Sequence, residues 1–281
     1  MAAGGRGRPP AGLPDLVAKY CDRWALSLDG APRHGSNGLA VPVLRGPEPM
    51  VLKVDWPGAE LAEQVRALQV WDGRGAVRLI EADVPAGVLL LERLDAEVSL
   101  RSLPLDEAVV RAGRLLRRLA VPAPAGFRGT WQEALSLRDS VRQRWRAAGR
   151  PFASGVVDTC LDLADELAAH RPAVMVHADL HYDNVLAGSR EPWLAIDPRP
   201  MTGAIEYQAG QLLWTRYDEI ATAGGLRRCL ERLVDAAGMD QRRAHGWAVL
   251  RCVDYWLWGL DAGFTEDPVR CRRIVAELLP G

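Results

Sequence analysis

The segment VMVHADLHYDNVLAGSREPWLAIDP, residues 174–198, constrains the fold more than any other part of the chain. Short apolar runs alternate in it with polar residues that fall at the ends of predicted strands. These polar residues are Asp179, Asp183, Asn184 and Asp197, with His177 and His181 beside them. Carboxylates brought close together repel one another unless a positive group lies among them. The segment therefore predicts a site that holds a cation.

The second half of this segment predicts a small hairpin. The apolar runs NVL and WLAI flank AGSREP, whose Gly and Pro indicate a turn. A hairpin over residues 184–196 returns the chain to its start and places Asp197 beside Asn184. Carboxylate and amide oxygens favour a hard cation such as Mg²⁺ over Zn²⁺. Asp179 would then lie beside the ion without binding it and would be free to accept a proton.

The two histidines of the segment also fit a different kind of site. His177 and His181 flank Asp179, as ligands do in some metal hydrolases. A zinc site needs a further His or Cys, and none lies near them in the sequence. We therefore expect His177 to form hydrogen bonds within the loop.

The N-terminal part of the chain predicts a second hairpin and a loop that can bind phosphate. Strands are expected at residues 39–44 and 51–54, and residues 30–38 form a Gly-rich loop before them. Backbone N–H groups at Gly35, Ser36 and Asn37 could cradle phosphates, although Gly-rich turns before hairpins are also common without that role. Lys53 lies on the second strand. Only Lys19 accompanies it in an otherwise arginine-based set of cations, which favours a specific role for Lys53.

Apolar periodicity sets the remaining architecture. A helix is predicted over residues 61–71, and Glu60 or Glu63 at its start could form an ion pair with Lys53. Glu63 is the favoured partner, and Gln64 is the alternative register. Strands are predicted over 76–83 and 87–94, and a helix over 105–119. Residues 1–94 are thus a strand-rich lobe and residues 95–281 a larger helical lobe. The fold class is α+β with two lobes.

Composition excludes several classes of protein. The 281 residues are 48% hydrophobic, enough for a substantial core, and the formal net charge is −1 without a basic block, which argues against a nucleic-acid partner. No apolar run has the length of a signal peptide or a membrane span, so a cytoplasmic location is expected. The five cysteines are scattered without a CxxC pair, as is typical of reduced thiols.

The motif HADLHYDNVL followed by AIDP resembles the catalytic and metal-binding segment of the aminoglycoside phosphotransferases, which share the two-lobed protein-kinase-like fold. The resemblance extends along most of the chain. The stretches WDGRGAVRLIEAD, GVLLLERLD, LPLDEAV and WLAIDPRPMTG are similar to the streptomycin 6-kinase and hydroxyurea phosphotransferase branch of that family.

The resemblance implies a role for each matching residue. Asp179 would be the catalytic base, Asn184 and Asp197 would bind Mg²⁺, and Lys53 would hold the phosphates of ATP. The adenine base would contact main-chain groups near Glu92 and Leu94, in the connector between the lobes. Phosphoryl transfer asks a protein mainly for such positioning and charge neutralisation. The clustered carboxylates are therefore explained by Mg²⁺ bound with ATP.

The chain departs from the family pattern at three places. Ala178 replaces a glycine, a change of little cost if the backbone there is not left-handed. Tyr182-Asp183 replaces a Pro-Gly pair, which adds a carboxylate near the cation. Gln208 takes the place of an aspartate that supports the catalytic loop from the helix behind it, and a neutral amide accepts hydrogen bonds more weakly than a carboxylate.

The acceptor is expected to be a small hydroxylated antibiotic bound by the C-terminal helices. An acidic, aromatic-lined site would suit a cationic aminoglycoside such as streptomycin. The candidate residues are Asp218, Asp254, Trp258 and Asp261. The same pattern also fits helices with a buried tryptophan face and a solvated charged face. A kinase of a nucleoside or peptide antibiotic, or a binding protein without catalysis, remains an alternative, and the oligomeric state is open.

Overall fold

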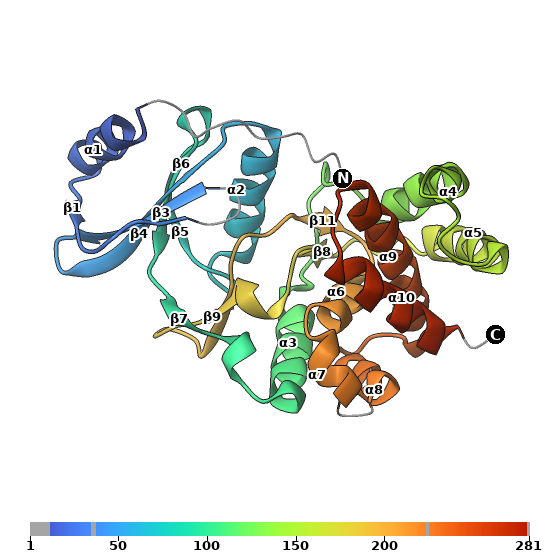
Figure 1. The fold of residues 1–281 in the computed structure, drawn as a ribbon. Helices are drawn as coiled ribbons and strands as arrows, with labels where there is room; N and C mark the ends of the chain where they lie inside the picture. The colour runs from blue at the N-terminus through green and yellow to red at the C-terminus, as the bar shows by residue number, and fades with distance from the viewer. Residues whose placement is uncertain (1–11, 35–37, 223–224, 280–281) are drawn as a thin grey trace. The chain divides into compact units, whose positions relative to one another are not determined.

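The computed structural model of the chain describes residues 12–34, 38–222 and 225–279. The chain divides into two compact units, Met1–Asp95 and Ala96–Gly281 (Figure 1). Among the helices of the described residues, none combines the length and the apolar character that a bilayer span requires.

The first unit is built on an antiparallel sheet. Its strand order is β1-β3-β4-β6-β5. The short strand β2 pairs with the N-terminal half of β3, and β1 pairs with the C-terminal half. The strands are β1 (Ser27–Leu28), β2 (Arg33–His34), β3 (Gly38–Arg45), β4 (Glu48–Asp55), β5 (Leu79–Asp83) and β6 (Val88–Glu92). The predicted strands are confirmed, with bounds that differ by a few residues. Part of the predicted loop 30–38 is instead the strand β2.

The β3–β4 hairpin sets the position of Lys53. Gly46 turns the chain with a positive φ of 59°, and the register places Lys53 opposite Ala40 on one side and Leu89 of β6 on the other. Gly38 begins β3 opposite Asp55. A Cβ at Gly38 would lie 2.3 Å from the carbonyl oxygen of Val54, so this close approach of two strands requires glycine.

Two helices cover the first unit's sheet. α1 (Leu13–Arg23), which the sequence did not predict, packs Leu13, Leu16 and Val17 against a core of alternate strand residues that includes Leu52 and Leu90. α2 (Ala59–Trp71) buries a separate stripe, as its apolar spacing predicts. The buried residues of this stripe include Leu61, Val65, Leu68 and Trp71.

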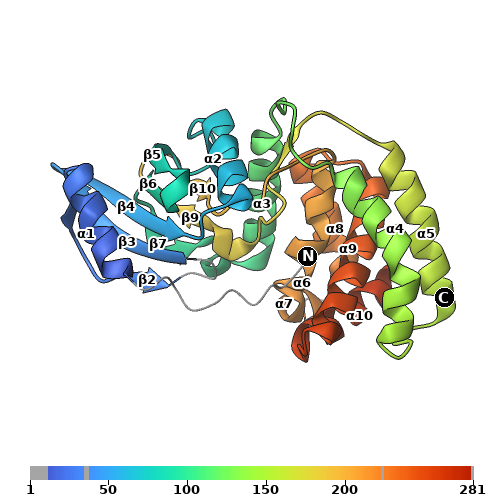
Figure 2. The ribbon, with the colours of Figure 1, turned by 90° about the horizontal axis from the view of Figure 1, so that it is seen from above.

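The second unit is mainly helical. Its α-helices are α3 (Leu105–Leu119), α4 (Thr130–Ala147), α5 (Ser154–Ala169), α6 (Ala209–Trp214), α7 (Tyr217–Thr222), α8 (Leu226–Ala237), α9 (Gln241–Asp261) and α10 (Glu266–Leu278). α3 packs on α8, α4 on α5, and α9 on α10 and α6. Figure 2 shows α4 and α5 running side by side. The side chains of Trp214, Trp247 and Trp256 are buried, so three of the four C-terminal tryptophans belong to the core.

Small strands of the second unit carry the residues of the motif. β8 (Met175–Val176) pairs with β11 (Met201–Thr202), and β9 (Val185–Ala187) pairs with β10 (Trp193–Ala195). β7 (Asp95–Ser99) adds to the other side of β9. The predicted hairpin is therefore confirmed. Residues 177–184 form the loop from β8 to the 3₁₀ turn η3 (Tyr182–Asn184), directly before β9.

Candidate active site

His177 fixes the start of the loop. Its ring is buried, and Nε2 lies 3.0 Å from the carbonyl oxygen of Ile196, to which it must donate because a carbonyl only accepts. The backbone N–H of Asp179 then donates to Nδ1 over 3.4 Å. Burial lowers the pKa of His177 to about 4, so the ring is neutral at neutral pH. His177 thus forms the hydrogen bonds expected of it, and both ring nitrogens are engaged by the protein.

The backbone of the site is left-handed at two residues that are not glycine, one in the loop and one after β10. The φ angle is 59° at Ala178 and 52° at Asp197. The condition under which Ala178 would replace the family glycine at little cost is therefore not met. An L-residue in this region crowds its Cβ against the backbone, at a cost of about 1 kcal/mol or more. Strain of this kind is found where surrounding structure holds a functional loop in place.

The carboxylate of Asp179 lies between two nitrogen donors. Its Oδ1 accepts a hydrogen bond of 2.8 Å from Nε2 of Gln211, and its Oδ2 lies 3.6 Å from Nε of Arg199. The side chain of Asp179 is 28% exposed, so a small molecule can reach it. Neither Gln211 nor Arg199 was predicted from the sequence. Arg199 follows Asp197 by two residues, and its backbone N–H donates to the carbonyl of His177.

Asn184 and Asp197 meet at one end of the β9–β10 hairpin, as the sequence predicts. Val185 is paired with Ala195, and the N–H of Ile196 donates to the carbonyl of Asn184 over 2.9 Å. The side-chain nitrogen of Asn184 donates to the carbonyl of Asp179 over 2.9 Å. With its nitrogen so engaged, the amide presents Oδ1 as the atom that can face a cation.

Gln211 contacts the loop, and Gln208 does not. Gln208 is fully buried, yet within the described residues neither its Oε1 nor its Nε2 has a hydrogen-bond partner. Within the described residues, Gln208 therefore supplies no hydrogen bond to the loop in place of the aspartate that the family pattern has there. Gln211 lies three residues later, nearly one helical turn, and donates to Asp179 instead. The spacing of two glutamines on one helical face is the sequence signal that could have identified it.

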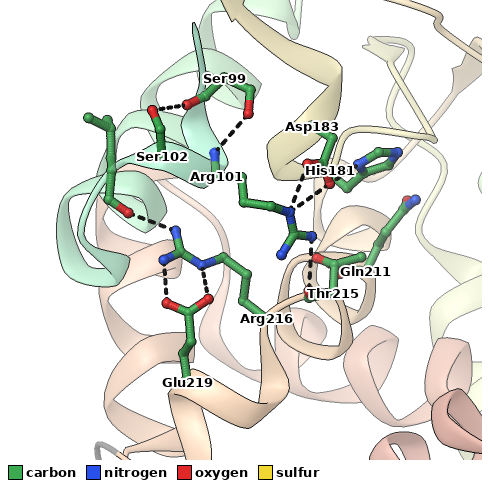
Figure 3. Close-up of polar contacts among 10 residues, drawn as sticks. Ser99, Arg101, Ser102, His181, Asp183, Gln211, Thr215, Arg216 and Glu219 are labelled. Carbon is green, nitrogen blue, oxygen red and sulfur yellow. Dashed lines mark hydrogen bonds and ion pairs between the residues drawn. The ribbon is translucent and has the colours of Figure 1, made fainter. Parts of the chain in front are cut away.

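Asp183 is held by an arginine from the segment that follows β7. Nε of Arg101 lies 2.7 Å from Oδ1 and 3.0 Å from Oδ2 of Asp183 (Figure 3). His181 lies on the other side, with Nδ1 3.4 Å from Oδ2. The nearby His181, and then the hydrogen bonds from Arg101, lower the pKa of Asp183 well below its usual range. The carboxylate of Asp183, which the family pattern lacks at this position, therefore already has partners within the protein.

The residues expected to bind nucleotide lie in the first unit. Nζ of Lys53 forms an ion pair of 3.3 Å with Asp55. Glu63 is half-buried on α2, and its pairing with Lys53 stays a prediction. Glu92 accepts a hydrogen bond of 2.6 Å from the N–H of Arg78. The main chain of Leu94 forms no hydrogen bond to the described residues, which leaves it available to a ligand. Gly35, Ser36 and Asn37 lie outside the described residues.

Three of the four acceptor candidates lie on α9, and two of the carboxylates already have arginine partners. Asp254 pairs with Arg144 at 2.6 Å, and Asp218 of α7 pairs with Arg270 at 2.6 Å. Asp261, the last residue of α9, is exposed. Trp258 stacks on Tyr255, with ring centroids 5.2 Å apart.

Tyr255 follows Asp254 on α9 and stacks on Trp258. Burial raises the pKa of Tyr255, and the hydrogen bond to Asp267 and the negative charge of Asp179 add to the increase. Tyr255 also stacks on Trp214 of α6, with centroids 4.6 Å apart. Tyr255 therefore joins the α9 candidates to α6, the helix that carries Gln211.

Comparisons with known proteins identify relatives of the chain. The chain matches the family of aminoglycoside/hydroxyurea antibiotic resistance kinases over residues 23–263. It is 38% identical to a streptomycin 6-kinase of Streptomyces glaucescens, over 92% of this chain and 87% of that protein. It is 40% identical to a hydroxyurea phosphotransferase of Kitasatospora aureofaciens, over 96% of this chain and 79% of that protein.

A solved structure confirms the predicted fold class. The crystal structure of aminoglycoside phosphotransferase APH(4)-Ia aligns with a TM-score of 0.67 over 95% of this chain and 100% of that chain, at 18% identity. A thermostable mutant of the same protein has been solved with AMP-PNP and hygromycin B. The fold of the present chain is the two-lobed, protein-kinase-like α+β fold.

The left-handed backbone at Ala178 gives a prediction about stability. Ala178→Gly should raise the free energy of unfolding by about 1 kcal/mol, because glycine adopts this conformation without steric cost. Ala187→Gly on β9, where φ is not positive, is the matched control and should lower it by about 0.5–1 kcal/mol. Denaturant unfolding of the three proteins measures both changes. A loss of stability in Ala178→Gly similar to that of the control would show that the backbone is not strained there.

Proposed function

The chain belongs to the aminoglycoside/hydroxyurea antibiotic resistance kinase family, and on this basis we propose that it phosphorylates a hydroxyl of a streptomycin-like antibiotic. It is an ATP-using antibiotic kinase. The observation that carries the assignment is the loop itself, in which Asp179 lies beside Asn184 while Asn184 meets Asp197 at the end of the hairpin. We further propose that it acts in the cytoplasm, where ATP is available, and that it confers resistance or protects a producer.

Asp179 is the proposed catalytic base. Its carboxylate is accessible, and the hydrogen bond from Gln211 occupies only Oδ1. A carboxylate in this position can orient the acceptor hydroxyl and take its proton as the oxygen attacks the γ-phosphorus. Arg199, 3.6 Å from Oδ2, adds a positive charge near the place where the transferred phosphoryl group would pass.

Asn184 and Asp197 are the proposed ligands of Mg²⁺. The fit rests on two hard oxygen donors that the hairpin register brings together, one of them on an amide whose nitrogen is already bonded. Mg²⁺ usually binds only one or two protein carboxylates and completes its coordination shell with phosphates and water. Two protein ligands are therefore enough for it. Bound with ATP, it would neutralise the charge that develops on the phosphates.

Residues of the first unit are proposed to bind the rest of ATP. Lys53 would hold the phosphates, with Glu63 as its partner, and Gly35, Ser36 and Asn37 would contribute backbone N–H groups. The adenine edge would meet the main chain at Glu92 and Leu94. The main chain of Leu94, which bonds to none of the described residues, supports this part of the proposal.

A cationic acceptor is favoured by the residues of α9. Asp254, Asp261 and, on α7, Asp218 can pair with guanidinium groups, and Trp258 can offer a ring face. Asp254 and Asp218 have arginine partners, so an acceptor would compete with Arg144 or Arg270. Streptomycin is the first acceptor to test because relatives at 37% and 38% identity are streptomycin 6-kinases.

A second acceptor is favoured by one comparison. The hydroxyurea phosphotransferase shares 40% identity with this chain, so a small neutral N-hydroxy compound is the alternative. Binding of such a neutral acceptor would depend on hydrogen bonds and not on ion pairs with carboxylates. Binding of other hydroxylated antibiotics, of nucleoside or peptide type, would likewise not require the negative charges of these aspartates.

A screen of ATP consumption against a panel of antibiotics tests the proposed function. The purified protein is incubated with ATP, Mg²⁺ and each compound, and mass spectrometry identifies any product that has gained one phosphoryl group. We expect such a product with streptomycin. If no compound of the panel is phosphorylated while nucleotide still binds, the chain is a binding protein on a kinase fold.

The role of Asp179 gives a direct prediction. Asp179→Asn keeps the size of the side chain but removes the proton acceptor, so kcat should fall by about 100-fold or more. The Kd for ATP should stay within about twofold, because the base contacts the acceptor and not the nucleotide. Asp158→Asn, an exposed carboxylate on α5, is the control and should leave both unchanged. Normal turnover in Asp179→Asn would remove this residue from the mechanism.

The metal ligands give a second prediction. Asp197→Ala should weaken ATP binding in the presence of Mg²⁺ by about 10-fold or more, since it removes a charged ligand of the ion. Asn184→Ala should have a smaller effect because it removes a neutral oxygen. Titration of ATP binding at several Mg²⁺ concentrations measures both. An unchanged Mg²⁺ dependence in Asp197→Ala would contradict the metal role.

Acceptor recognition gives a third prediction. Asp254→Asn and Asp261→Asn should raise the KM for streptomycin by about threefold to fivefold, the size expected for partly exposed ion pairs, and leave the KM for ATP unchanged. Arg144→Gln should act in the opposite direction because it frees Asp254 from its partner. If neither aspartate variant changes the acceptor KM by about twofold, the acceptor is not bound by these carboxylates.

A further inference from the structure

Two polar residues beside Asp179 have no part in the proposed chemistry. Gln211, on the short helix α6, is buried and donates to Oδ1 of Asp179 over 2.8 Å. Asp183, on the loop, faces Arg101. Gln211 is hydrogen-bonded to the base, and Asp183 lies four positions after it in the sequence. Their contacts therefore affect how the carboxylate of Asp179 is held.

Arg101 joins these two residues into one network. Its Nε is shared by both oxygens of Asp183, and its Nη2 donates to the carbonyl of Thr215 over 3.1 Å (Figure 3). The hydroxyl of Thr215 donates to the carbonyl of Gln211 over 2.8 Å. The path from Asp183 through Arg101 and Thr215 to Gln211 therefore ends on Asp179, and both of its ends lie on the loop.

A second arginine holds the same turn of the chain. Arg216 is 5% exposed, and its guanidinium donates to both carboxylate oxygens of Glu219 and, over 3.0 Å, to the carbonyl of Leu103. The guanidinium also lies 5.2 Å from the ring centroid of Tyr182. The turn after α6 is thus tied to the start of α3 and to the loop.

The local structure around Arg101 is itself ordered by hydrogen bonds. Ser99 Oγ accepts from the N–H of Arg101 over 3.3 Å, and Ser102 Oγ donates to the carbonyl of Ser99 over 2.7 Å. These bonds shape the 3₁₀ turn η2 (Leu100–Ser102) and direct the Arg101 side chain toward the loop (Figure 3). These hydrogen bonds therefore hold the backbone of Arg101 in place.

The network matters for geometry more than for stability. The side chains of Arg101 and Asp183 are 42% and 47% exposed, and an ion pair so exposed adds little to the free energy of folding. A misplacement of a catalytic group by about 1 Å, in contrast, can cost about 100-fold in rate. A buried amide that donates to Oδ1 fixes the plane of the carboxylate and leaves Oδ2 for the acceptor proton.

We propose that Gln211 is a positioning residue for Asp179, and that the Arg101–Asp183 ion pair keeps α6 where Gln211 can reach the carboxylate. The proposal rests on the proposed function in taking Asp179 as the base. It makes Asp183 a structural anchor of the loop, with no role as a ligand of the metal.

Kinetics with streptomycin test the proposal. Gln211→Leu should lower kcat by about 10- to 100-fold and leave the KM values for ATP and acceptor within about twofold, since only the orientation of the base changes. Arg101→Ala should lower kcat in the same way. The double variant should be no slower than Gln211→Leu alone because both act through one path. Independent, multiplying effects would contradict the network.

Matched controls separate positioning from general destabilisation. Gln208→Leu removes a buried amide three residues away that has no partner among the described residues, and kcat should be unchanged. Arg142→Ala breaks an exposed ion pair of 3.0 Å with Asp158 and should also leave kcat unchanged. Asp183→Asn should not alter the Mg²⁺ dependence of ATP binding. A clear change in that dependence would make Asp183 a metal ligand and overturn its role as an anchor.

Crystal structures give a readout that needs no acceptor. In the wild type, Gln211 should donate to Asp179, and in Arg101→Ala this hydrogen bond should be lost or lengthened beyond 3.5 Å, while α3 and α8 stay in place. An intact Gln211–Asp179 bond in Arg101→Ala would overturn the proposal even if no antibiotic is phosphorylated. Failure of the wild type to phosphorylate any antibiotic would instead contradict the proposed function alone.

Discussion

The antiparallel pairing of β9 with β10 is the constraint on which the site depends. Its register places Asp197, which follows β10, beside Asn184, which precedes β9. His177 then ties the beginning of the loop to the same strand through Ile196. The hairpin therefore brings the oxygens of Asn184 and Asp197 together, and the loop places the accessible carboxylate of Asp179 beside them. The surrounding helices only have to hold the hairpin and the loop in place.

The site contains unfavourable local features, and neighbouring contacts compensate for them. Ala178 and Asp197 are left-handed without being glycine, and Gln208 is buried without a hydrogen-bond partner among the described residues. Against these costs stand the bonds of His177, the contact of Gln211 with Asp179, and the pairing of Asp183 with Arg101. Such a distribution is expected where function fixes a backbone that local preferences alone would not choose.

The sequence predicted the hairpin, the strand of Lys53 and the helix over residues 105–119, because each follows from a clear apolar period with turn residues at its ends. It did not predict the support of the base. Arg101 and Asp183 are 82 residues apart, and no local pattern links them. The motif spacing pointed to Gln208, whereas the helix turns Gln211 toward Asp179. The left-handed φ of Ala178 could not be anticipated either, since alanine rarely adopts it.

The central claim is that Asp179 acts on a hydroxyl of the acceptor while Asn184 and Asp197 hold Mg²⁺ with the nucleotide. A crystal structure of the wild-type protein with AMP-PNP, Mg²⁺ and streptomycin tests it most directly. We expect Mg²⁺ bound to oxygens of Asn184 and Asp197, and one streptomycin hydroxyl in hydrogen-bond contact with the Asp179 carboxylate. A complex in which Mg²⁺ contacts neither residue, or in which every acceptor hydroxyl lies away from Asp179, would contradict it.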